Sequence, residues 1–126
     1  MHSKHNLLFT ATLLLMTVGG ARADIVDIRW STDRSFSHQG TIAAGKFVEV
    51  CGKLAAGSTV HWEFNASVPV DFNVHYHVRK EVVFPFKLSA VANAKDRLDA
   101  KMGQDYCWMW SNKSAAVTTL SVSLRR

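Results

Sequence analysis

The stretch "QDYCWMWSN" (residues 104–112) concentrates aromatic and sulfur-containing side chains in a way that predicts a core strand. Side chains alternate between two faces along an extended strand, and three rings here share one face: Tyr106, Trp108 and Trp110. Burying such rings removes a large apolar area from water, so this face is expected to meet the core. The other face carries Cys107 and Met109. Asn112 is expected to begin a turn into a last strand.

The same alternation of apolar and polar residues runs through much of the chain. It is strictest over residues 59–65, 70–77 and 119–124, and it is typical of strands with one buried face. Residues 25–30, 47–51 and 82–88 are further strand candidates, rich in β-branched and aromatic side chains. Four apolar residues of the alternating segments are expected to meet the aromatic face across the core: Trp62, Phe64, Phe72 and Tyr76.

Short strands separated by turn residues predict an all-β fold, an antiparallel β-sandwich of about six to eight strands. Turns are predicted at residues 55–58 and 67–69, where small residues and a proline interrupt the alternation. Residues 90–103 differ from the rest because their composition favours a helix, and Gly103 could end it. A short helix or a long loop is therefore predicted there.

The first 23 residues have the features of a secretory signal peptide. Lys4 lies in a polar leader, an apolar run covers residues 7–18, and Ala21 and Ala23 fit the A-x-A cleavage pattern. The run is too short to span a bilayer, which takes about 20 apolar residues. Cleavage after Ala23 would leave one secreted or periplasmic domain, residues 24–126. No second apolar run of spanning length follows, so no membrane span is expected.

Charge gives little indication of a nucleic-acid partner. The whole chain has 15 Lys and Arg against 10 Asp and Glu. Removing Lys4 and Arg22 with the signal leaves 13 against 10, an excess of three basic residues. These are scattered without a basic stripe, which is typical of a solvated surface, and nucleic-acid binding is not expected.

Two cysteines, Cys51 and Cys107, lie on separate strand candidates. In an exported domain such a pair usually forms a disulfide, which is the interpretation favoured here. The alternative is a free Cys107 that binds a metal. One sulfur cannot serve both roles, because the thiolate is the metal ligand.

The metal alternative has its own pattern. His75 and His77 share one face of a strand, and His61 also occupies a polar face. Together with Met109 and Cys107 they are the side chains that copper prefers. If their strands were neighbours, these residues could converge on a copper ion.

Residues 63–77 ("EFNASVPVDFNVHYH") and 105–124 ("DYCWMWSNKSAAVTTLSVSL") resemble the GOLD domain, the β-sandwich of lumenal Golgi cargo receptors. In that family an aromatic-x-hydrophobic-x-aromatic strand runs into an Asn- and Ser-containing turn. The matching positions here are Tyr106, Trp108, Trp110, Asn112 and Ser114. The resemblance implies a β-sandwich in which Cys51 and Cys107 pair. The late strand also resembles small secreted bacterial proteins of unassigned function.

These features predict a non-enzymatic binding module with an unknown protein or small ligand as partner. One alternative is a periplasmic copper-binding protein, for which copper would be the only cofactor. A second is a small hydrolase-type enzyme, with His61 and Glu63, or Asp71 and His75, as base and orienting group. The chain contains no G-x-S-x-G, H-E-x-x-H or glycine-rich phosphate loop, so an enzyme is not expected.

Overall fold

The computed structural model describes residues 24–126, so the predicted signal peptide at residues 1–23 lies outside the described residues. The described chain forms seven strands and no helix: β1 (Asp24–Asp27), β2 (Ser35–Ile42), β3 (Phe47–Leu54), β4 (Thr59–Val78), β5 (Glu81–Asp99), β6 (Gln104–Ser111) and β7 (Thr118–Arg125). The all-β prediction is confirmed. No helix able to cross a membrane occurs between residues 24 and 126.

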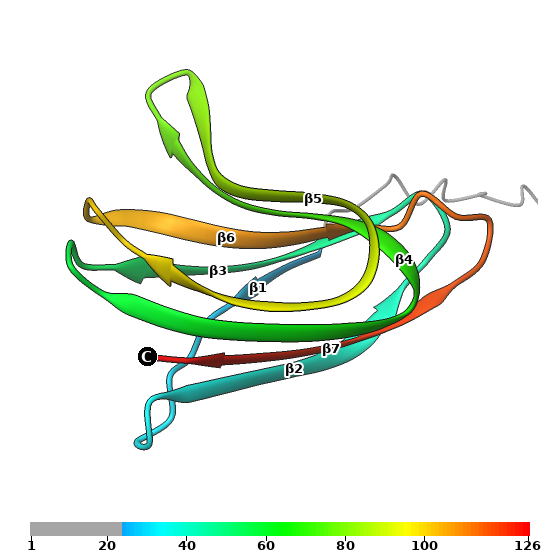
Figure 1. The fold of residues 1–126 in the computed structure, drawn as a ribbon, viewed down its shortest axis with the longest axis horizontal. Coiled ribbons are helices and arrows are strands. Elements are labelled where there is room, and N and C mark those ends of the chain that lie inside the picture. The colour runs from blue at the N-terminus through cyan, green and yellow to red at the C-terminus, as the bar shows by residue number, and fades with distance from the viewer. Residues whose placement is uncertain (1–23) are drawn as a thin grey trace, which may run out of the picture.

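The long hairpin of β4 and β5 folds back on itself and makes the two layers of the sandwich (Figure 1). The first part of β4, from His61 to Ala66, pairs with β7, whereas the second part, from Asp71 to His75, pairs with β6. The hydrogen-bonded order is therefore β1-β3-β6-β4-β7-β2, with β5 beside β4. One layer contains β2, β7 and the first part of β4. The other contains β1, β3, β6 and the second part of β4.

The fold-back occurs where the pairing of β4 with β5 loses its register. Shifts fall between Asn65 and Val70 and between Val70 and Phe72. Pro69 lies in this interval, and proline suits such an interruption because it has no N–H to donate to the ladder. The prediction of a turn at residues 67–69 is therefore wrong in form. β4 continues as a strand through these residues and curves back over itself, so that its second part lies in the other layer (Figure 1).

The core lies between the two layers and combines aliphatic side chains with a group of contacting aromatic rings. Trp62 of the first part of β4 packs on Phe72 of the second part, with ring centroids 4.8 Å apart. Phe64 meets Trp110 at 5.7 Å. Trp108 and Trp110 are fully buried, and Tyr106 is only 1% exposed. Tyr76 is only partly buried and packs against Tyr106, 5.0 Å away. The aromatic face of β6 thus contacts the rings from β4.

Residues 90–103 contain neither the predicted helix nor the long loop. β5 continues through them to Asp99 and pairs with the first part of β4, from Thr59↔Asp99 to Asn65↔Asn93. Leu98 and Ala100 are buried in the core. The prediction was wrong because helix propensity is a local preference of a few tenths of a kcal/mol per residue, which a paired strand overrides.

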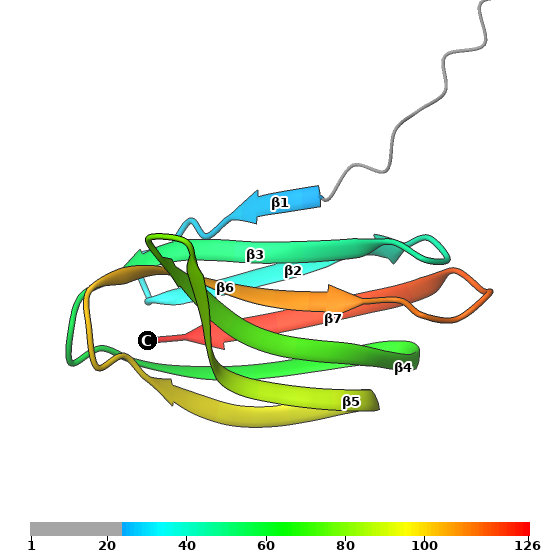
Figure 2. The ribbon, with the colours of Figure 1, turned by 90° about the horizontal axis from the view of Figure 1, so that it is seen from above.

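Two further features were not expected from the sequence. β2 was missed because its sequence, SFSHQGTI, is polar with one buried end, yet it pairs with β7 over its whole length. β1 pairs with β3 in parallel, so the sheet is mixed. Figure 2 shows β1 at the edge beside β3.

The turn after β6 is organised by Asn112, which is fully buried. Its Nδ2 donates to the carbonyl oxygens of Ile42, at 3.0 Å, and Ala116, at 2.7 Å. Its Oδ1 accepts from the backbone N–H of Ser114 at 3.0 Å and from the Ser114 hydroxyl at 2.7 Å. Asn112 and Ser114 therefore have a structural role, joining β6 to the start of β7.

Candidate functional site

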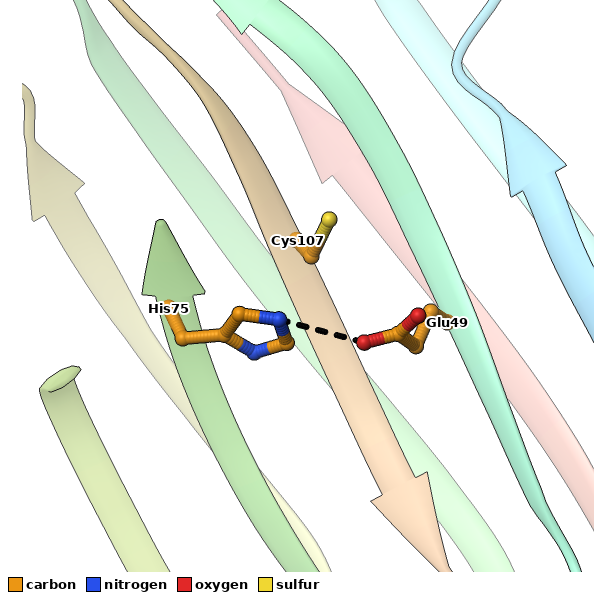
Figure 3. Close-up of side chains that lie close together, drawn as sticks. All are labelled: Glu49, His75 and Cys107. Carbon is orange, nitrogen blue, oxygen red and sulfur yellow. Dashed lines mark ion pairs between the residues drawn. The ribbon is translucent and has the colours of Figure 1, made fainter. Parts of the chain in front are cut away.

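Three strands of one layer bring a polar cluster together on the outer face of the sandwich (Figure 3). β6 runs between β3 and β4, and Cys107 of β6 lies directly opposite both Cys51 of β3 and His75 of β4. Glu49 lies two residues before Cys51, so its side chain points to the same face. In this way a carboxylate, an imidazole and two sulfurs from distant parts of the chain become neighbours.

His75 is the centre of the cluster. Its Nε2 lies 3.1 Å from Glu49 Oε1, and its Nδ1 lies 2.7 Å from Asn73 Oδ1. The side chain of His75 is only 6% exposed, and that of Glu49 is 15% exposed. Each ring nitrogen therefore lies close to an oxygen atom, and the ring is largely removed from water; when neutral it has one N–H and can donate to only one of the two oxygens. Asp71, considered from the sequence as an orienting group for His75, instead accepts a hydrogen bond from the backbone of Ala90.

Burial decides the ionisation of His75. Desolvation lowers the pKa of its imidazole below the usual value of 6.5, and this effect outweighs the opposite effect of the Glu49 carboxylate. His77, whose ring lies 5.3 Å away, lowers the pKa of His75 further. At neutral pH the ring is therefore mainly uncharged, and one of its nitrogens carries a lone pair.

Cys51 and Cys107 form a disulfide between directly opposite residues of β3 and β6. The predicted bridge is present, so Cys107 is not a thiolate ligand while it is intact. The donor atoms of Glu49, His75 and Cys107 nevertheless lie within 4.8 Å of one another. The disulfide and a metal ligand set thus occupy the same place in the fold.

The other predicted metal ligands are distributed unevenly. His77 lies beside His75. Met109 follows Cys107 by two residues on β6 and lies opposite Glu49 of β3 and Asn73 of β4. His61 is on the first part of β4, opposite Arg97 and Arg125 in the other layer, and is not part of the cluster. Glu49 was missed, although its alternation with Val48 and Val50 placed it on the face that Cys51 shares.

A second feature is the closed end of the β4–β5 hairpin, residues 78–87, here called the hairpin end. It turns away from the rest of the layer (Figure 1). Val82 and Phe84 are exposed there by 42% and 43%. The ammonium of Lys87 lies 4.5 Å from the centre of the Phe84 ring, and Phe84 in turn lies 5.8 Å from His75. The hairpin end therefore presents a basic and aromatic surface next to the cluster.

A cleft of about 350 Å³ lies where the hairpin end meets the edge of the core. Val83 and Pro85 of the hairpin end line it, together with core-edge rings. Those rings belong to Trp62, Tyr76, Phe86 and Tyr106. Arg97, Asp99 and Lys101 also line the cleft, and Arg97 and Asp99 form an ion pair. Val83 pairs with Tyr76, whereas Phe84 contacts His75 of the outer face, so the cleft and the exposed Phe84 lie on opposite faces of the hairpin end.

Comparisons with known proteins define the fold but not a family. No protein-family model matches the chain, and no curated protein matches it in sequence. Its structure is similar to PliG of Aeromonas hydrophila, a periplasmic inhibitor of g-type lysozyme, with a TM-score of 0.63 and 13% identity over 82% of this chain and 96% of that one. It is also similar to the pre-peptidase C-terminal domain of a Bacillus anthracis collagenase, with a TM-score of 0.58 and 10% identity over 82% and 95%.

A mutant of PliG from Escherichia coli matches at a TM-score of 0.55 and 9% identity, over 82% of this chain and 98% of that one. Identities this low show a shared fold alone. None of these three structures is a GOLD domain, so the resemblance to that family holds only for the β-sandwich itself.

Proposed function

We propose that this protein is an exported binding module that recognises another protein through the hairpin end. The supporting observation is the exposure of Val82 and Phe84 on a hairpin that stands apart from the sandwich. Large apolar side chains grouped at the surface mark interaction sites, and aromatic anchors supply much of the binding energy of interfaces.

Charge indicates what kind of partner this surface fits. The hairpin end contains Arg79, Lys80 and Lys87, of which Lys87 lies over the Phe84 ring, whereas Glu81 is its one acidic residue. A basic surface attracts an acidic one and speeds its association. We therefore propose a partner with an acidic recess.

A lysozyme-type hydrolase is the first such partner to test. Two of the similar structures are inhibitors of g-type lysozyme, and glycoside hydrolases commonly keep a pair of carboxyl groups in their substrate cleft. A projecting hairpin with basic and aromatic side chains would suit such a cleft. In this proposal the module works outside the cytoplasm and catalyses no reaction itself.

The test is calorimetric binding of residues 24–126 to a purified g-type lysozyme, with lysozyme activity on bacterial cell walls measured in parallel. We expect binding with loss of lysozyme activity. Phe84→Ala should weaken binding by about fivefold or more, since loss of an interface anchor costs more than about 1 kcal/mol. Exchanging Arg79 and Lys80 for Glu should slow association and reduce its dependence on salt.

Val117→Ala is the matched control, because Val117 is also an exposed apolar residue but lies in the turn between β6 and β7. It should bind like the wild type. Absence of binding by the wild-type module would reject lysozyme as the partner. Binding that Phe84→Ala and the charge exchanges leave unchanged would reject the hairpin end as the surface.

A further inference from the structure

We propose that reduction of the Cys51–Cys107 disulfide creates a metal site in which both sulfurs, His75 and Glu49 bind one Zn²⁺ ion. The motivating observation is the convergence of donor groups from three neighbouring strands at one point on the outer face (Figure 3). This site adjoins the hairpin end, where Phe84 lies 5.8 Å from His75, but the metal-binding proposal does not depend on protein binding.

The distances between the donor atoms suit a tetrahedral Zn²⁺ ion. Ligands about 2.0–2.3 Å from zinc at the tetrahedral angle stand roughly 3.3–3.8 Å apart. His75 Nε2 and Glu49 Oε1 are 3.1 Å apart, and Cys107 Sγ is within 4.8 Å of both. Cys51 would supply the fourth donor. Its sulfur is bonded to that of Cys107 but lies outside the group of donor atoms within 4.8 Å of one another, so its side chain must rotate towards the site after reduction. Small side-chain rotations would therefore complete a four-ligand set.

The ligand chemistry also favours zinc. Two thiolates with an imidazole and a carboxylate are the side chains that bind Zn²⁺ in proteins. The ring of His75 is oriented by Asn73, since an Nδ1–H that donates to Asn73 Oδ1 leaves the Nε2 lone pair directed at Glu49. Such a hydrogen bond to the far nitrogen fixes the orientation of a metal-binding histidine.

Reduction is required because the disulfide sulfurs are poor ligands. A dithiol supplies two electrons and two protons: the Cys51–Cys107 bond breaks, two thiols form, and the dithiol becomes its own disulfide. Zn²⁺ then binds the two thiolates and releases two protons. The oxidised protein would therefore keep the site closed, and a thiol reductant would open it.

The test uses residues 24–126 in the oxidised form and after dithiol reduction followed by anaerobic desalting. Co²⁺ serves as the spectroscopic probe, and Zn²⁺ is titrated in competition with a coloured chelator. We expect the reduced protein to bind one Co²⁺ with sulfur-to-cobalt charge-transfer bands and tetrahedral d–d bands, and Zn²⁺ to displace it. The oxidised protein should show neither band. Near-ultraviolet circular dichroism of the buried tryptophans reports whether the reduced chain is folded.

Variants assign the ligands. Cys107→Ser should reduce the charge-transfer bands and Cys51→Ser/Cys107→Ser should abolish them, and His75→Ala and Glu49→Gln should each weaken Zn²⁺ binding. Asn73→Ala should weaken it by about 10–100-fold, the usual effect of removing a group that orients a ligand. His61→Ala is the matched control, because this exposed histidine lies in the other layer, and it should leave binding unchanged.

If reduction loosens the fold, Zn²⁺ should restore the near-ultraviolet signal of the tryptophans, since metal binding and folding are coupled. The proposal is overturned if the reduced chain neither binds Co²⁺ nor regains that signal with Zn²⁺. It is equally overturned if binding is unaffected by His75→Ala and Glu49→Gln, or if the oxidised protein binds just as tightly.

Discussion

Asp71 accepts a hydrogen bond of 3.0 Å on its Oδ1 from the backbone N–H of Ala90, a residue with a positive φ of 53°. The two residues lie on β4 and β5 close to the place where the hairpin folds back into the second layer. The contact therefore satisfies a backbone donor that the interrupted ladder leaves without a strand partner. It also stabilises the left-handed backbone that the bend needs on β5.

Ala90 gives a test of this bend. Ala90→Val should lower the free energy of unfolding, because a β-branched residue is strongly disfavoured at positive φ. Ala90→Gly should keep or raise stability by up to about 1 kcal/mol, since glycine adopts this backbone without a steric penalty. Urea unfolding monitored by tryptophan fluorescence measures both. Because Ala90 is exposed, a valine variant as stable as wild type would show that no strain exists at this position.

The tryptophans of β6 should dominate the stability of the core. Trp108→Ala and Trp110→Ala should each cost about 3–5 kcal/mol, because both side chains are fully buried. Trp110→Phe should be milder than Trp110→Ala, since the indole N–H has no hydrogen-bond partner to lose. Thermal melting ranks the variants. Met109→Thr, on the opposite face of the same strand, is the control and should lower the melting temperature much less.

Reducing the disulfide should destabilise the protein substantially. Cys51 and Cys107 are 56 residues apart in sequence, and closing a loop of that length restricts the unfolded chain by about 4 kcal/mol. Urea titrations with and without a dithiol, in the presence of a chelator, measure the difference. The double variant Cys51→Ala/Cys107→Ala should match the reduced wild type. Equal midpoints for oxidised and reduced protein would contradict the expectation.

Stability of the oxidised protein should fall in mild acid because of His75. Its pKa is lowered in the folded state by burial, so below pH 6.5 the unfolded chain takes up this proton more readily than the folded one. The contribution of neutral His75 to the free energy of unfolding is thus fully present above pH 6.5. It is lost as the pH falls through the lowered pKa of His75 in the folded state. Melting temperatures measured across this range should decline less in His75→Gln. His61→Gln, at an exposed site, should follow the wild-type profile.

Much of the architecture could be read from alternation. Period-two patterns located β4, β6 and β7 and assigned Trp108 and Trp110 to the inner face, because the two faces of a strand follow from the backbone alone. The pairing of Cys51 with Cys107 followed from the exported character of the chain together with a family resemblance. β2 escaped notice because a half-exposed strand of polar residues has no pattern that separates it from a loop.

Pairing and register, by contrast, were decided only by the tertiary structure. Nothing local in residues 90–99 identifies them as a strand, since their conformation is stabilised by β4 residues some 30 to 40 positions earlier, such as Thr59 opposite Asp99. The same holds for the cluster: Glu49, His75 and Cys107 each lie on a predictable strand face, but only the order β3-β6-β4 makes them neighbours. Strand faces follow from the covalent backbone, whereas strand order follows from which apolar faces pack together across the whole chain.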